Sequence, residues 1–229
     1  RKVLDLVQVH NLLDLDVHFG TGALQLDLEP GRGLIDAIDN PARIDGLFIE
    51  RAMVRANDNL AILSAEAPVN QPLLSDGGTF FMLREEINAA FETTVIDLPR
   101  HMMITYPHML QDVDSVVLVT ELSLAAARDT IRLLASFKST CPGAKVIIVA
   151  NKVSTNNLEI SRKDFEATIE RPVDIVIPED ARLAVKAAKL GKCMADAARG
   201  TKLSAAYAKL LQAVLAASTE DEDEDGVVK

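Results

Sequence analysis

The sequence is short of tryptophan, cysteine and long apolar runs, and each shortage narrows the kind of protein it encodes. Trp is absent and aromatic residues make up only 4% of the chain, which argues against stacking platforms for single-stranded nucleic acid or sugars. Two cysteines, Cys141 and Cys193, are too few for a disulfide framework, and neither has a Cys or His at metal-ligand spacing. We therefore expect both thiols to be reduced, in a cytoplasmic compartment.

The apolar content is that of a folded domain rather than a membrane span. No apolar run approaches the roughly 20 residues of a transmembrane helix, and the start, Arg1 to Asp5, lacks the apolar stretch of a signal peptide. Hydrophobic residues make up 48% and charged residues 25%, which rules out disorder of the whole chain. We expect one domain over residues 1–217 and a disordered acidic tail over residues 218–229.

Positive charge is also scarce. The net charge is −10, and six of the 34 acidic residues form one run, Glu220 to Asp225. Removing residues 219–229 leaves 23 basic and 28 acidic residues, so the remaining body is only mildly acidic. We therefore expect no bulk electrostatic binding to nucleic acid. The acidic run is typical of a solvated segment, and a specific binding role is the alternative.

Apolar strands alternate with amphipathic helices along the chain, which predicts an α/β fold with a mainly parallel sheet between two layers of helices. The expected strands, buried on both faces, are Leu12 to Asp16, Leu60 to Ser64, Thr94 to Leu98, Ser115 to Thr120, Lys145 to Ala150 and Asp174 to Ile177. The expected helices are Gly33 to Ile38, Ile44 to Arg55, Thr79 to Phe91, Leu124 to Phe137, Ser161 to Ile169, Asp180 to Leu190 and Lys202 to Ala217.

Polar residues recur where these strands end, and ligands of open α/β sheets bind at that edge. They are Asp14, Asp16, Asp97, Asn151, Lys152, Pro178 and Asp180. Carboxylates suit Mg²⁺, which prefers oxygen ligands, and an Asn amide offers a donor and an acceptor to a purine. Taken singly, Asp97 is also explained as a side chain that caps the next turn rather than as a metal ligand. Asp14 and Asp16 are also explained as solvated charges in a loop. Met102, Met103 and Met109 indicate either core packing or a partner surface.

Taken in order, these motifs resemble the MinD/ParA group of P-loop NTPases. The shared motifs are residues 13–20 (LDLDVHFG), 95–99 (VIDLP), 149–152 (VANK) and 177–180 (IPED). Residues 19–24 (FGTGAL), 26–34 (LDLEPGRGL) and 43–49 (RIDGLFI) are similar to the CpaE/TadZ branch, the pilus-assembly ATPases of the Flp or tight-adherence machinery. The resemblance covers roughly residues 12–217 and implies a three-layer α/β/α fold that binds ATP and Mg²⁺.

The resemblance implies a role for each matching residue. Asp16 is expected to position the water that attacks ATP, and Asp14 and Asp97 are expected beside Mg²⁺. Asn151, Lys152, Pro178 and Asp180 are expected on the adenine side. The family's Gly-rich phosphate loop with its Lys is absent, because no Gly precedes Gly20. Either the chain lacks an N-terminal portion that its relatives have, or it is a degenerate relative.

The implied activity is ATP-dependent dimerisation with slow hydrolysis, which would act as a switch that places pilus secretion machinery at a cell pole. The expected partners are a second copy of the chain and proteins of that machinery, with peripheral association to the inner membrane through them. Two alternatives stay open. One is a non-hydrolysing scaffold on the same fold, which the missing loop supports, and the other is a partition-type ATPase, which the acidic balance disfavours.

Overall fold

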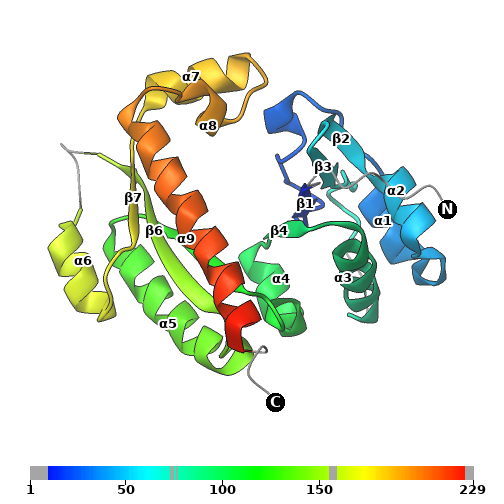
Figure 1. The fold of residues 1–229 in the computed structure, drawn as a ribbon, viewed down its shortest axis with the longest axis horizontal. Coiled ribbons are helices and arrows are strands. Elements are labelled where there is room, and N and C mark those ends of the chain that lie inside the picture. Colours follow the sequence, from blue (N-terminus) through cyan, green and yellow to red (C-terminus); the bar gives the residue numbers. More distant parts are fainter. Residues whose placement is uncertain (1–9, 73–74, 76, 155–158, 225–229) are drawn as a thin grey trace. The chain divides into compact units, whose positions relative to one another are not determined.

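A computed structural model describes residues 10–72, 75, 77–154 and 159–224 of the chain (Figure 1). The chain divides into two compact units. The N-terminal unit holds Arg1–Met109 with Leu190–Lys192, and the C-terminal unit holds Leu110–Lys189 with Cys193–Lys229. Among the described residues, none of the helices is both long and apolar enough to cross a bilayer.

The N-terminal unit is built on a four-stranded sheet in the order β2-β3-β1-β4. Its strands are β1 (His10–Asp14), β2 (Val54–Asn57), β3 (Leu60–Leu63) and β4 (Thr93–Asp97). β1 pairs in parallel with both β3 and β4, whereas β2 is antiparallel to β3. The carboxyl ends of β1, β3 and β4 therefore lie at one edge of the sheet.

Short helices bury the apolar side chains of this sheet. They are α1 (Gly33–Asp39), α2 (Gly46–Ala52), α3 (Gly78–Ala90) and α4 (Arg100–Thr105), with 3₁₀ turns at Leu24–Leu26, Pro41–Arg43 and Pro107–Leu110. Leu13 and Leu63 of the strands pack in one buried cluster with Leu34, Phe80 and Met102 of the helices. This core holds the strand ends, and the loops that follow them, in place.

The C-terminal unit has a three-stranded parallel sheet in the order β5-β6-β7. Its elements are β5 (Ser115–Thr120), β6 (Lys145–Val153), β7 (Ile175–Pro178), α5 (Leu124–Thr140), α6 (Arg162–Ile169), α7 (Ala181–Lys189), α8 (Met194–Ala197) and α9 (Lys202–Glu224). Ile147 and Val149 of β6 face the apolar side of α9, where Leu203 and Leu210 pack against them. Figure 1 shows α5 and α6 on the other side of this sheet.

The expected helix from Ile44 to Arg55 is wrong at both ends, because α2 spans only Gly46–Ala52. The helix ends at Ala52, and the chain turns into β2, which pairs with β3 across a turn at Asp58 and Asn59. The Asn57 side chain accepts a hydrogen bond of 2.8 Å from the Asn59 backbone N–H and so stabilises the turn. Antiparallel pairing across this turn overrides the helical periodicity that continues to Arg55.

Two further expectations need correction. β4 and β5 are not buried on both faces: Val95 is 55% exposed and Val119 is 56% exposed, because each strand ends its sheet among the described residues. The last helix does not stop at Ala217 but continues to Glu224, into the segment expected to be disordered. Extending a helix fixes one more residue and gains one more backbone hydrogen bond, so it is favoured over starting one. Residues 225–229 lie outside the described residues.

Candidate functional site

Asp14 and Asp97 are the last residues of two neighbouring parallel strands. They are register partners at the carboxyl ends of β1 and β4. The ladder continues one residue further, because the Leu15 N–H donates to the Asp97 carbonyl at 3.1 Å. β1 thus ends at Asp14, two residues before the expected Asp16, and Asp16 begins the loop that follows. The structure brings the three predicted carboxylates together at this edge of the N-terminal unit.

The Asp14 carboxylate is buried and holds that loop. One oxygen accepts the Asp16 backbone N–H at 3.1 Å and the other accepts the Gly22 N–H at 3.0 Å, while the residue is only 2% exposed. Gly20 packs directly against it, since a Cβ there would come within 2.6 Å of one Asp14 carboxylate oxygen and 2.7 Å of the other. Sequence reasoning missed Gly20 and Gly22, although their spacing after the two aspartates was visible.

No hydrogen bond to the described residues occupies the second carboxylate oxygen of Asp16. Its Oδ1 accepts the Phe19 N–H at 3.1 Å, and its backbone carbonyl accepts the Gly20 N–H at 2.7 Å. The side chain borders a hollow of about 420 Å³ whose lining includes His18, Phe19 and Tyr106. In contrast to Asp14, Asp16 therefore has an oxygen that can orient a water molecule or another donor.

Negative charge accumulates around Asp97. Partial burial of its carboxyl group raises its pKa, and the neighbouring Asp14 and Asp16 carboxylates raise it further. No three His, Cys, Asp or Glu side chains among the described residues converge as a metal site. Mg²⁺ does not need such a cluster, because it keeps several waters and usually binds through one or two carboxylates. The Asp97 carboxylate, repelled by its neighbours, fits a hydrated divalent cation.

The adenine-side candidates gather in the C-terminal unit. Asn151 and Lys152 do not follow β6, as expected, but lie within it, at an irregularity in the pairing of β6 with β7. Lys152 has a φ of +53°, and its N–H is bonded to the Asn151 Oδ1 at 2.9 Å. Val153 pairs with Pro178, which brings Asn151 and Pro178 to neighbouring strand ends.

The Asp180 carboxylate has a structural partner. It accepts the Leu183 N–H at 2.9 Å and so caps the first turn of α7. The Glu179 N–H donates to the Val153 carbonyl at 3.1 Å, which ties the loop after β7 to the end of β6. Among the described residues, the bonds at this edge use the Asn151 Oδ1 and the Asp180 carboxylate, and no bond occupies the amide nitrogen of Asn151.

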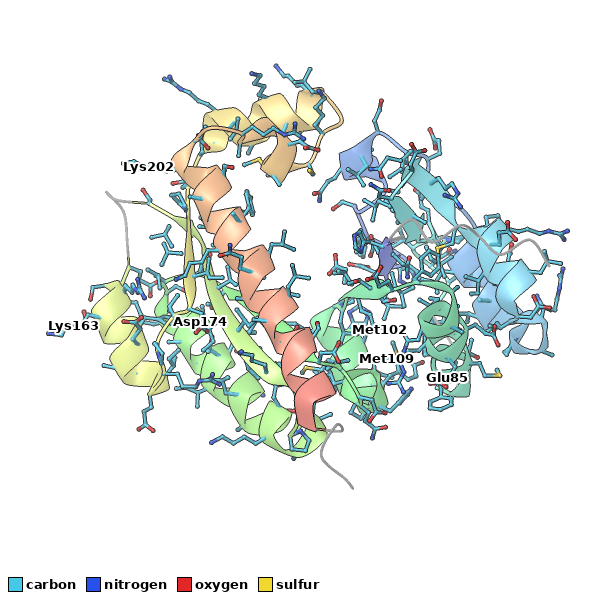
Figure 2. All side chains as sticks on the ribbon, in the orientation of Figure 1. Glu85, Met102, Met109, Lys163, Asp174 and Lys202 are labelled. Carbon is cyan, nitrogen blue, oxygen red and sulfur yellow. The ribbon has the colours of Figure 1, made fainter. Side chains whose placement is uncertain are left out.

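Two of the three methionines after β4 belong to the core, whereas Met103 is only half-buried. Met102 and Met109, labelled in Figure 2, are each 2% exposed, and Tyr106 packs against Phe80 with ring centroids 4.9 Å apart. For these two methionines the packing interpretation is confirmed. Their burial fixes α4, which follows Asp97, against the N-terminal unit.

Comparison with known proteins adds the fold. No protein-family model and no curated protein sequence matches the chain. A ParA family ATPase from Chlorobium tepidum matches with a TM-score of 0.70 and 17% identity over 86% of this chain and 83% of that one. The MinD cell division protein of Aquifex aeolicus matches with a TM-score of 0.67 and 16% identity over 92% and 86%.

A third structure was solved with a ligand. The septum site-determining protein MinD from Pyrococcus horikoshii, complexed with Mg-ADP, matches with a TM-score of 0.69 and 18% identity. The match covers 90% of this chain and 82% of that one. Identities this low establish architecture alone. Strand order, parallel register and these matches together show that the chain has the α/β fold of the MinD and ParA ATPases.

Proposed function

We propose that the chain works as a nucleotide-dependent dimerisation switch, with ATP and Mg²⁺ as its ligands, in the placement of pilus secretion machinery. The observation that carries the proposal is the Asp14–Asp97 register pair with Asp16 beside it at the carboxyl edge of a parallel sheet. The MinD of Pyrococcus horikoshii, which shares this fold, was solved with Mg-ADP. The pilus assignment rests on the resemblance of residues 19–49 to the CpaE/TadZ branch.

Each residue has a proposed task that its surroundings support. Asp97 holds hydrated Mg²⁺, since a cation relieves the repulsion from Asp14 and Asp16. Asp16 orients a water through the oxygen that Phe19 leaves unused. When bound, Mg²⁺ supplies charge neutralisation to phosphate oxygens.

On the second unit, the Asn151 amide reads a purine edge, with Lys152 beside it. Pro178 and Asp180 shape the neighbouring loop, whose backbone is held by Val153 and Leu183. The residues of this chain fit the phosphates less well than they fit Mg²⁺ and the base. The sequence has no Gly-rich loop with a Lys to surround the phosphates.

A switch of this kind works because the two ligand states make different contacts across the dimer. A ligand that bridges two copies stabilises the dimer only in the state that makes the bridging contacts, so its loss shifts the balance to monomers. The proposed partners are a second copy and pilus-assembly proteins, at the cytoplasmic side of the inner membrane. A scaffold that binds the same partners without turnover is the second candidate, favoured by the missing phosphate loop.

The test uses the chain extended at its N-terminus by a Gly-rich phosphate loop. Asp16→Ala should leave nucleotide binding intact, slow single-turnover hydrolysis by about 10²–10⁴ and raise the dimer fraction, because the side chain acts on water. Asp97→Ala should weaken Mg²⁺-dependent binding instead. Asp39→Ala, at the exposed end of α1, is the control. Parental hydrolysis by Asp16→Ala would favour the scaffold.

A further inference from the structure

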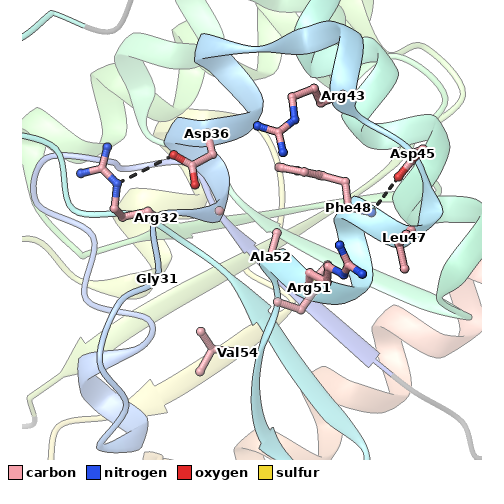
Figure 3. A pocket seen from close by; sticks show the side chains of 12 residues that line it. Gly31, Arg32, Asp36, Arg43, Asp45, Leu47, Phe48, Arg51, Ala52 and Val54 are labelled. Carbon is pink, nitrogen blue, oxygen red and sulfur yellow. Dashed lines mark hydrogen bonds and ion pairs between the residues drawn. The ribbon is translucent and has the colours of Figure 1, made fainter.

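The N-terminal unit carries a second hollow, lined by three arginines. It has a volume of about 560 Å³ and lies between the start of α1, the turn before α2, α2 itself and the start of β2 (Figure 3). Arg32, Arg43 and Arg51 line it, each from a different one of these segments. We call it the arginine hollow. It contains none of the residues assigned to the proposed nucleotide site.

In the described residues, the acidic side chains of the arginine hollow have hydrogen-bond or ion-pair partners, whereas two of its guanidinium groups have none. Asp45 caps α2 by accepting the Phe48 N–H at 2.7 Å, and Asp36 lies 3.8 Å from Arg32. The Arg43 backbone N–H donates to the Asn40 carbonyl, but within the described part of the chain neither the Arg43 nor the Arg51 guanidinium group has a hydrogen bond or an ion pair. Two exposed guanidinium groups therefore face this hollow with their donors unused, in a chain whose net charge is −10.

The rest of the lining is apolar. Leu47 is 54% exposed, and Val54 and the half-buried Phe48 complete the wall. Figure 3 shows the Phe48 side chain between those of Arg43 and Arg51. Phe48 also packs against the core, so it is not free to be sandwiched as a stacking platform. The lining of the hollow thus combines guanidinium groups with apolar side chains.

We propose that the arginine hollow binds an acidic peptide segment of a partner protein, in which carboxylates alternate with apolar side chains. Guanidinium groups bind carboxylates through two parallel hydrogen bonds, and an exposed Leu beside them accepts an apolar neighbour. A compact phosphate chain fits less well, because Asp36 and Asp45 stand among the arginines and repel concentrated negative charge.

The test is a titration of the full chain with a blocked peptide of sequence Glu-Leu-Glu-Glu-Leu-Glu. The side-chain Nε–H signals of Arg43 and Arg51 should shift and saturate, while that of Arg132, exposed on α5, should stay in place. Fluorescence anisotropy of the labelled peptide gives the dissociation constant. The double variant Arg43→Gln with Arg51→Gln should bind at least about tenfold more weakly, or about 1.4 kcal/mol. Arg132→Gln is the matched control.

Charge and geometry are separated by further arms of the experiment. Arg43→Lys with Arg51→Lys keeps the charge but loses the fork, so it should recover only part of the affinity. Equal binding of the Gln-for-Glu peptide, or parental binding by the double Gln variant, would overturn the proposal. So would displacement of the peptide by inorganic phosphate or ADP at equal concentration. Arginine signals that move when Glu220 to Asp225 are replaced by amides would identify the chain's own acidic run as the occupant, against a separate partner.

Discussion

Gly20 is a position at which the candidate site has no room for a side chain. A Cβ at Gly20 would lie 2.5 Å from the Asp16 carbonyl oxygen and 2.6 Å from the nearer Asp14 carboxylate oxygen, whereas one at Gly22 would be 3.0 Å from that oxygen. Gly20→Ala should therefore lower the free energy of unfolding by about 1–3 kcal/mol, because the loop must leave the Asp14 hydrogen bonds or strain against them. Gly22→Ala should cost less. Urea unfolding of both variants measures the difference in the free energy of unfolding. Equal values would contradict the close packing of Gly20 against Asp14 and Asp16.

Asp97 predicts a pH dependence of stability in the metal-free chain. Its pKa is raised in the folded state, so folding favours the protonated carboxyl, and stability falls as the pH rises from the unfolded pKa through the folded pKa. Asp97→Asn should thus be more stable than the parent at neutral pH. The gain should vanish below the unfolded pKa, where the carboxyl is protonated in both states.

Thermal unfolding in a metal chelator, across the acid range, tests this dependence. Added Mg²⁺ should stabilise the parent more than Asp97→Asn, because the variant lacks the carboxylate that would hold the cation. A variant that is less stable than the parent at neutral pH would contradict the predicted repulsion. Equal stabilisation of both chains by Mg²⁺ would show that Asp97 does not bind the metal.

The sequence predicts that three carboxylates lie together at one edge of the sheet, but it does not predict the hydrogen bonds that each accepts. Asp14, Asp16 and Asp97 were predictable as neighbours because each stands at or just after the end of an apolar strand. That Asp14 has both oxygens occupied while Asp16 has one left depends on where Phe19 and Gly22 place their N–H groups. These hydrogen bonds join residues two, three and eight positions apart in an irregular loop, and hydrophobic periodicity does not encode the conformation of such a loop.

At the scale of elements, one face of the apolar strand β5 is exposed, although its sequence predicts a buried strand. Ser115 to Thr120 holds four apolar residues and no charge. Val117 and Val119 are nevertheless exposed, because β5 is the end strand of its sheet among the described residues. An uncharged apolar end strand favours association between molecules. Val119→Lys should reduce concentration-dependent light scattering while changing unfolding by less than about 1 kcal/mol.

The control for β5 lies one strand away. Val149→Lys alters a fully buried residue of β6 and should unfold the C-terminal unit. Loss of folding in Val119→Lys as well would show that its side chain is covered. Unchanged scattering in a folded Val119→Lys chain would show that this strand edge does not drive association.

All six expected strands are present, and no strand end is displaced by more than three residues. The exception among strands is β2, which the helical pattern from Ile44 to Arg55 concealed. β2 exists because it pairs with β3, and its own residues, Val54 to Asn57, include an exposed Arg and Asn rather than an apolar run. Long, strongly patterned segments such as α5 and β6 were predictable, because burial against one sheet imposes their periodicity.

At the scale of the whole molecule, the fold persists at sequence identities of 16–18% to the ParA and MinD structures. Identities this low show a shared arrangement of strands and helices and nothing finer. The fold therefore supports the placement of ligand groups at strand ends, and the ligand itself must be tested on this chain. Fold and function separate at this point, since one fold hosts many activities.

The chain should bind ATP only weakly. Tight binding of a triphosphate needs backbone N–H groups that converge on the phosphates and a Lys that adds charge, and these 229 residues contain no Gly-rich loop of that kind. Carboxylates for Mg²⁺ and an Asn for the base supply only part of the contacts. Isothermal titration with Mg-ATP should therefore give a dissociation constant weaker than about 1 μM, or roughly −8 kcal/mol. A tighter constant that Asn151→Ala abolishes would mean that other residues of this chain bind the phosphates.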